Sequence, residues 1–193
     1  MTFVRQIAKF ISQREDAAVE ALGYILSRSE TARLGLANML RDGDADVGVI
    51  AKIETQVSGE DRTRPDLSVI DEQGTERVLI EAKLSAGLTE NQPNGYLSRL
   101  PKDRQSALLF VVPTERLEKL WSDVYRSASS EHELAFHPAT PGVKSAVIVG
   151  SGRRLMMVSW SDLIVLHMVG TMSYAEDHLT LYNIVQLSDL IDG

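Results

Sequence analysis

The stretch Pro65–Tyr96 reads PDLSVIDEQGTERVLIEAKLSAGLTENQPNGY, and it decides the fold. Two apolar runs with several β-branched residues, 65–71 and 78–84, stand on either side of a short polar segment that contains a glycine. This pattern is typical of a β-hairpin. Because side chains alternate between the two faces of a strand, Glu81 and Lys83 share one face. The hairpin therefore places an acid and a base side by side.

The residues before the hairpin predict two helices and a strand. Ser12 and Glu15 have the spacing of a capping box, and apolar residues at helical spacing follow, so we expect a helix from about residue 13 to 28. A second helical pattern covers 34–40, and a strand is expected over 47–57. Its buried face would consist of Val49, Ile53, Thr55 and Val57.

The residues after the hairpin predict a further strand between helices. Gln92 and Pro93 indicate the start of a helix that stops before Pro101. The unbroken apolar run 107–112 predicts a central strand that is covered on both faces. The other expected segments are a helix over 114–124, a loop over 128–142, strands at 147–149 and 155–158, a helix over 161–169 and an amphipathic helix over 174–192. Helices mixed with strands in this order predict an α/β fold, or α+β in some schemes.

Composition limits the class of protein. The chain has 193 residues and no cysteine, which fits a single domain, 1–193, in a reducing compartment, and we expect a cytoplasmic protein. No apolar run approaches the roughly 18 residues that a membrane span needs. The net charge of −7 argues against a non-specific nucleic-acid binder, although a local basic groove stays open. We expect the core at about 12–170, with the last helix leading into a missing region or an interface.

Two carboxylates from one hairpin indicate a metal site. Asp66 and Glu81 would repel each other, and a divalent cation relieves that repulsion by binding both. Mg²⁺ prefers oxygen ligands and takes one or two carboxylates with several waters, so the Ala82 carbonyl could complete the protein's share. Lys83 could orient an attacking water or stabilise charge on a phosphate. This chemistry is metal-assisted hydrolysis of a phosphodiester bond.

These residues resemble the signature of the PD-(D/E)XK nuclease superfamily. Pro65-Asp66, fourteen intervening residues and then Glu81-Ala82-Lys83 match it, and the order of a helix, three meandering strands, a helix and a fourth strand is also similar. The resemblance covers residues 12–112. It implies a restriction-endonuclease-like fold, with a central mixed sheet of about four to five strands flanked by helices.

The resemblance also implies roles for the residues. Asp66 and Glu81 would be metal ligands and Lys83 the catalytic lysine, with Mg²⁺ as cofactor and Mn²⁺ as a substitute. Gln92 matches the family's glutamine after the third strand. For the family's acid on the first helix, a further residue of the metal site, we choose Glu20, because Glu15 has a capping explanation. The implied function is an endo- or exodeoxyribonuclease, with DNA as partner and a role in phage defence, restriction or repair.

Other readings of the same residues stay open. Asp66 could be a turn residue, Glu81 and Lys83 an exposed ion pair, Gln92 a helix cap, and Glu20 a solvated helix residue. The nearby basic residues Arg62, Arg64, Arg99, Lys102 and Arg104 fit a solvated surface better than a phosphate site. The alternative function is an inactive nuclease-fold module for binding or assembly. A homodimer, a partner domain and RNA as the substrate also stay open.

Overall fold

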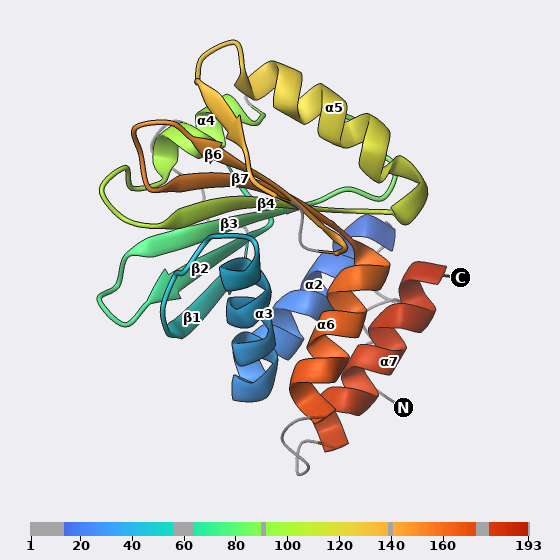
Figure 1. The fold of residues 1–193 in the computed structure, drawn as a ribbon. Helices are drawn as coiled ribbons and strands as arrows, with labels where there is room; N and C mark the ends of the chain where they lie inside the picture. Colours follow the sequence, from blue (N-terminus) through green and yellow to red (C-terminus); the bar gives the residue numbers. More distant parts are fainter. Residues whose placement is uncertain (1–13, 56–63, 90–91, 139–140, 173–177, 193) are drawn as a thin grey trace.

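The computed structural model describes residues 14–55, 64–89, 92–138, 141–172 and 178–192. A seven-stranded mixed sheet crosses the protein in the order β1-β2-β3-β4-β7-β6-β5, with helices on both faces (Figure 1). The α/β class expected from the sequence is confirmed. The sheet is wider than the expected four to five strands, because β5, β6 and β7 extend it beyond β4.

The middle strands of the sheet are parallel and the outer ones antiparallel. β3 pairs in parallel with β4, and β4 with β7, whereas β1-β2, β2-β3, β7-β6 and β6-β5 are antiparallel pairs. The carboxyl ends of β3, β4 and β7 therefore meet at one edge of the sheet. The strands are β1 (Ile50–Thr55), β2 (Leu67–Asp71), β3 (Glu76–Ala82), β4 (Ser106–Val112), β5 (Leu134–Phe136), β6 (Val143–Ile148) and β7 (Arg153–Ser159).

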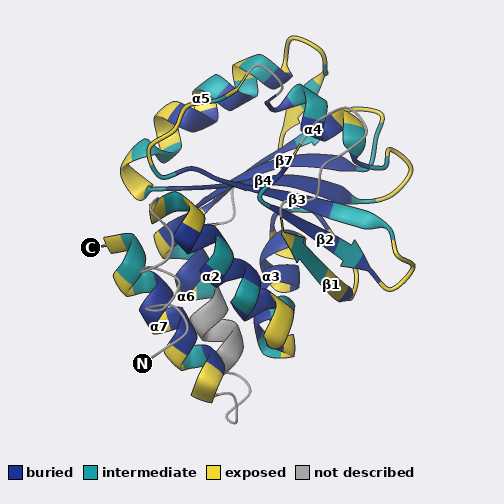
Figure 2. Cartoon of the chain, turned by 180° about the vertical axis from the view of Figure 1, so that it is seen from behind, coloured by how far each residue is buried: buried dark blue, intermediate teal, exposed yellow. Residues whose placement is uncertain are grey.

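Two layers of helices cover the sheet, and each has its own apolar cluster. Alternate residues of β3 serve the two clusters, since Ile80 packs with the first layer and Leu79 with the second. The first layer consists of α2 (Arg14–Arg28), α3 (Glu30–Asp42), α6 (Trp160–Met172) and α7 (His178–Asp192). The second consists of α4 (Asn94–Arg99) and α5 (Leu117–Ala128), which the 3-10 turn η1 (Thr114–Arg116) precedes. Buried residues fill the middle strands, and exposed ones lie on loops and outer helix faces (Figure 2).

The hairpin and the central strand follow the sequence pattern closely. β2 and β3 form the expected antiparallel pair, with Leu67 opposite Ile80. All residues of β4 are buried, as an apolar run with no polar position requires. The helix after Gln92 is α4, and it ends before Pro101 as expected.

The expected buried face of the first strand is correct at Ile53 and wrong at Val49 and Thr55. Ile50 is buried, whereas Val49 is 62% exposed and lies before the strand begins. A register shift between Ile50 and Lys52 then brings Ile53 towards the core, while Thr55 is exposed. A β-bulge inserts one residue and so breaks strict alternation, which is why the simple period failed here. Val57, the fourth residue of the expected face, lies outside the described residues.

Two further expectations need correction. The expected loop 128–142 contains the end of α5 and the short edge strand β5. The helix expected over 161–169 begins at Trp160, and its cap is Ser159, whose hydroxyl accepts from the Asp162 N–H at 2.9 Å. Apolar periodicity cannot identify a strand of three residues, and it cannot fix the first residue of a helix to within one position.

The last helix finds its apolar surface within the described chain. α7 packs against α2 and α6, with Leu187 2% exposed and Leu190 packed against the same cluster. The Arg14 guanidinium at the start of α2 donates to the carbonyls of Leu190 (2.8 Å) and Ile191 at the end of α7. None of the described helices combines the length and the apolarity needed to cross a bilayer.

The turn between β6 and β7 gives a stability test. A Cβ at Gly152 would lie 2.1 Å from the Arg104 carbonyl oxygen, and the Gly152 N–H already donates to the Lys102 carbonyl. Gly152→Ala must push two backbone segments apart, so we expect the free energy of unfolding to fall by about 1–3 kcal/mol in urea denaturation. Gly87→Ala, where a Cβ meets nothing within 4 Å, is the control and should change it by less than about 0.5 kcal/mol. Equal effects in both variants would contradict this packing.

Candidate functional site

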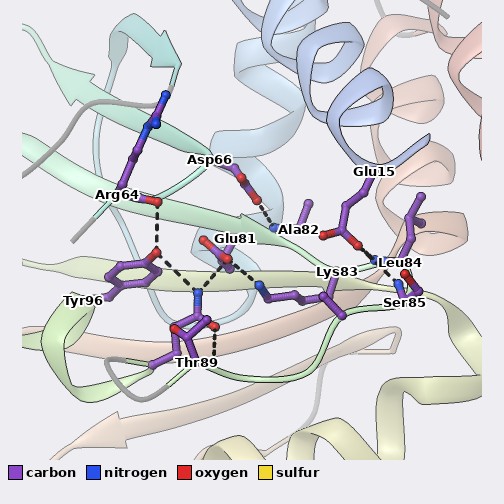
Figure 3. A network of polar contacts seen from close by, with 12 residues as sticks. Glu15, Arg64, Asp66, Glu81, Ala82, Lys83, Leu84, Ser85, Thr89 and Tyr96 are labelled. Atoms are coloured by element: carbon purple, nitrogen blue, oxygen red, sulfur yellow. Dashed lines mark hydrogen bonds and ion pairs between the residues drawn. The ribbon is translucent and has the colours of Figure 1, made fainter. Parts of the chain in front are cut away.

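The two acids of the sequence motif come from neighbouring strands. Asp66 directly precedes β2 and Glu81 lies near the end of β3, and because the two strands are antiparallel these positions meet at one edge of the sheet. Ile80 and Ala82 face the α2 layer, so Glu81 between them faces the α4 layer. Figure 3 shows Asp66, Glu81 and Lys83 in one polar network.

The Glu81 carboxylate is buried and only half satisfied. Glu81 is 5% exposed, and Oε1 accepts from Lys83 Nζ at 2.7 Å and from Gln92 Nε2 at 2.6 Å. Oε2 is buried without a hydrogen-bond partner among the described residues. An unpaired buried carboxylate oxygen is costly, so this atom marks a position where a cation or a donor would be favourable.

The environment of Asp66 disfavours the charged form of its carboxyl group. Burial, and then repulsion by Glu81, raise the pKa of its carboxyl group to about 7, with a smaller contribution from Glu15. A hydrogen bond from the Ala82 N–H to Asp66 Oδ2, at 2.7 Å, and the charge of Lys83 act in the opposite direction. The site thus has two acids that disfavour each other's charge.

Gln92 belongs to the network and does not cap a helix. Its Nε2 donates to Glu81 and, at 3.3 Å, to the Tyr96 hydroxyl, while its Oε1 accepts from the Thr89 N–H at 3.2 Å. The N-cap position of α4 is Pro93, with no side-chain cap. These three contacts fix which end of the amide faces Glu81. Of the readings left open for Gln92, the structure supports contact with the acid.

Tyr96 extends the network by one step. Its hydroxyl donates to the Arg64 carbonyl at 3.0 Å, and burial followed by the charge of Glu81 raises its pKa to about 12. The phenol therefore stays neutral and works as a hydrogen-bond relay. Sequence reasoning did not assign Tyr96 a role, although its position four residues after Gln92 places both on one side of a helical turn.

Ala82 contributes backbone groups on the side of Asp66. Its N–H donates to Asp66, whereas the next N–H, from Lys83, donates to the Val111 carbonyl at 2.8 Å. In an extended strand the N–H and C=O of one residue point to the same edge, so the Ala82 carbonyl also faces Asp66. This is the orientation that a carbonyl ligand to a shared cation would need.

The first helix presents Glu15 to the site, where we expected Glu20. Glu15 Oε2 accepts from the N–H groups of Leu84 and Ser85, and Glu15 raises the pKa of Asp66 (Figure 3). Five residues correspond to about 140° of rotation around a helix, so Glu20 faces another direction. No hydrogen bond or ion pair joins Glu20 to another described residue. The capping role assumed for Glu15 involved Ser12, which lies outside the described residues.

The basic residues around the hairpin do not gather at the acids. Arg99 pairs with Glu76 at 2.6 Å, at the start of β3. Lys102 and Arg104 precede β4, which runs parallel to β3, so they lie at the opposite edge of the sheet from Glu81. Arg64 contributes its carbonyl to Tyr96, and Arg62 lies outside the described residues.

A cavity of about 790 Å³ opens beside the network. It is lined by the segments that follow the three parallel strands, 84–86, 113–115 and 160–161, and by the facing ends of α2 and α7. Crevices at the carboxyl ends of parallel strands are the usual ligand sites of open α/β sheets. Glu15, Leu84 and Ser85 line both this cavity and the edge of the network.

The oxygen atoms present fit a hard divalent cation. Among the described residues, no group of three or more His, Cys, Asp or Glu side chains lies together as a metal site. Asp66 and Glu81 supply two carboxylates and Ala82 a carbonyl. Mg²⁺ commonly binds with this few protein ligands, because waters complete its octahedral coordination. The partnerless Glu81 Oε2 fits such an ion.

Comparison of the chain with protein-family models, with curated proteins and with solved structures finds no match. The function therefore has to be argued from the geometry of this network.

The raised pKa of Asp66 predicts how stability depends on pH. Between pH 3.8, its ordinary pKa, and about 7, Asp66 ionises in the unfolded chain but holds its proton in the folded one, so stability falls as pH rises through this window. Asp66→Asn cannot ionise and still accepts from Ala82. The measurement is urea denaturation in the presence of a chelator. The free energy of unfolding of the variant, minus that of the wild type, should rise from pH 4 to 7 and stay constant above pH 7.

Asp103→Asn is the control, because Asp103 is exposed at the far edge of the sheet. Its stability should follow the wild type across the whole pH range. Parallel curves for the wild type and Asp66→Asn would show that the pKa of Asp66 is not raised.

Proposed function

We propose that the chain is a metal-dependent nuclease of the PD-(D/E)XK type, with a restriction-endonuclease-like fold. The observation that supports this most is the half-satisfied Glu81 carboxylate: Oε1 is held by Lys83 and Gln92, and Oε2 is left without a partner on the site it shares with Asp66. The order of α2, the β1-β2-β3 meander, α4 and parallel β4 also supports the proposal.

The metal would be Mg²⁺, with Mn²⁺ as substitute, held by Asp66, Glu81 and the Ala82 carbonyl. When bound, the ion would polarise the phosphate and lower the pKa of a bound water. Ligation by both carboxylates would remove the repulsion by Glu81 that, after burial, raises the pKa of Asp66. Gln92 keeps the Glu81 carboxylate in one orientation, so that Oε2 stays directed away from the donors on Oε1.

Lys83 is the residue best placed to act on the phosphate. Its ammonium lies 2.7 Å from Glu81 Oε1 and its side chain is 7% exposed, so its charge is poorly screened by solvent. In this position it can hold an attacking water or stabilise the negative charge that develops on the phosphoryl oxygens. Loss of such a group typically lowers a rate by about 100- to 1,000-fold.

The substrate we propose is DNA, bound along the cavity at the carboxyl ends of β3, β4 and β7. With a net charge of −7, the protein cannot rely on overall attraction to phosphates, and affinity must come from local contacts and from the metal. Strong dependence on the divalent ion is the expected consequence.

Cleavage assays test the proposed reaction. With Mg²⁺ or Mn²⁺, we expect the wild type to cut plasmid or single-stranded DNA, and a chelator to abolish cleavage. Asp66→Asn and Lys83→Met should each lower the rate by at least about 100-fold. The matched controls Asp103→Asn and Lys102→Met make the same chemical changes at the opposite edge of the sheet and should cut as the wild type does. Unchanged cleavage in Asp66→Asn or Lys83→Met would refute the assigned residues. RNA substrates in the same assay decide the polymer.

The second candidate is an inactive nuclease-fold module for binding or assembly. It is favoured by an exposed apolar row on α7, where Leu179, Tyr182 and Val185 are 67%, 52% and 42% exposed at three-residue spacing. It is also favoured by Lys83, which already neutralises one charge of the acid pair.

Metal binding separates the two candidates without any substrate. For the nuclease, Mg²⁺ at 100 times its Kd should stabilise the folded protein by about 2.7 kcal/mol, seen as a higher Tm, because the ion binds only the folded chain. Asp66→Asn should lose this gain, and Asp103→Asn should keep it. A Tm that does not respond to Mg²⁺ or Mn²⁺, together with no heat of binding in calorimetry, would favour the inactive module.

A further inference from the structure

Two charged side chains from different helical elements hold the segment that follows β3. Glu15, in the first turn of α2, accepts from the N–H groups of Leu84 and Ser85 (Figure 3). Arg116, at the end of η1, donates to the carbonyls of Leu84 at 2.9 Å and Ala86 at 2.8 Å. Glu15 thus accepts from N–H groups of this segment, and Arg116 donates to its carbonyl groups.

The segment needs these partners because β2 does not reach it. The β2-β3 pairing ends with Leu67 opposite Ile80, and beyond this point β2 offers no backbone acceptor. Asp66 takes the Ala82 N–H and Glu15 takes the Leu84 N–H, so two carboxylates continue the ladder that the strand began. On the side of the chain that faces β4, the Lys83 N–H still donates to a carbonyl of β4.

We propose that Glu15 and Arg116 are positioning residues for the reaction, and that Glu15 is not a metal ligand. Together they fix the backbone on the carboxyl side of Lys83, which keeps its ammonium on Glu81 and sets the wall that the network shares with the cavity. One of the two Glu15 oxygens, Oε2, is already occupied by two backbone donors. This role rests on the proposed nuclease function, but the contacts themselves can be tested without it.

Hydrogen exchange at the Leu84 and Ser85 amides tests the contacts directly. Glu15→Gln keeps an oxygen that can accept from both amides and removes only the charge, whereas Glu15→Ala removes the acceptor. We expect exchange to quicken at least about tenfold in Glu15→Ala and to stay near the wild-type rate in Glu15→Gln. The control Asp16→Ala, at the exposed neighbouring position, should leave both amides protected. Unprotected amides in the wild type, or equal protection in Glu15→Ala, would overturn the proposal.

Kinetics test whether the contacts serve the reaction. Glu15→Ala and Arg116→Ala should each lower kcat by about 10- to 100-fold, with the Mg²⁺ dependence unchanged and with kcat restored in Glu15→Gln. Arg126→Ala, an exposed arginine on α5, is the control for Arg116. Because Arg116 acts from the other side of the segment, it tests the idea even if Glu15→Ala fails to fold.

The outcomes separate this inference from the nuclease proposal. A Glu15→Gln variant as impaired as Glu15→Ala, with a raised Mg²⁺ requirement, would make Glu15 a ligand and overturn the positioning role. Lost protection with unchanged kcat would overturn it as well. A wild type that cuts no nucleic acid refutes the nuclease itself, and with it the kinetic role, while the exchange rates still decide whether Glu15 holds the segment.

Discussion

The buried Glu81 carboxylate is the constraint on which the site depends. A charge at 5% exposure is tolerated only when partners surround it, and here Lys83 and Gln92 provide them from the chain that follows β3. Those partners are in place only if Lys83 and Gln92 keep fixed positions relative to Glu81. The contacts of Tyr96 and of the Thr89 N–H with Gln92 therefore serve the same end, which is to hold one carboxylate in one orientation.

Two bases offset part of the negative charge of three acids at this edge of the sheet. Asp66 and Glu15 each accept from backbone N–H groups, Glu81 pairs with Lys83, and Arg116 donates to backbone carbonyls. The two oxygens of Glu81 differ, because Oε1 has two partners whereas Oε2 is buried without one among the described residues. A surface cluster of acids would show no such contrast, since water would solvate each oxygen equally.

The sequence predicted the parts of the site that are close in the chain. Asp66, Glu81, Lys83 and Gln92 lie on one hairpin and the turn after it, where a two-residue period fixes which side chains share a face. Glu15 and Arg116 escaped prediction because they reach Leu84 across 69 and 32 positions from helical elements, and apolar periodicity does not fix how a helix end approaches a neighbouring loop. The same limit applies to β5, whose three residues are too few to show a period.

The cavity beside the network has walls from residues as far apart in the chain as Arg14 and Asp192. None of these segments forms a wall of the cavity by itself. Each one adjoins the end of a strand or helix, and these ends reach their positions only when the helices pack on the sheet. Contacts of such wide separation form late in folding. A partly folded chain would thus present an incomplete site, so any chemistry at this edge of the sheet is confined to the finished fold. For the proposed nuclease, this arrangement would keep a nascent chain inactive until folding is complete.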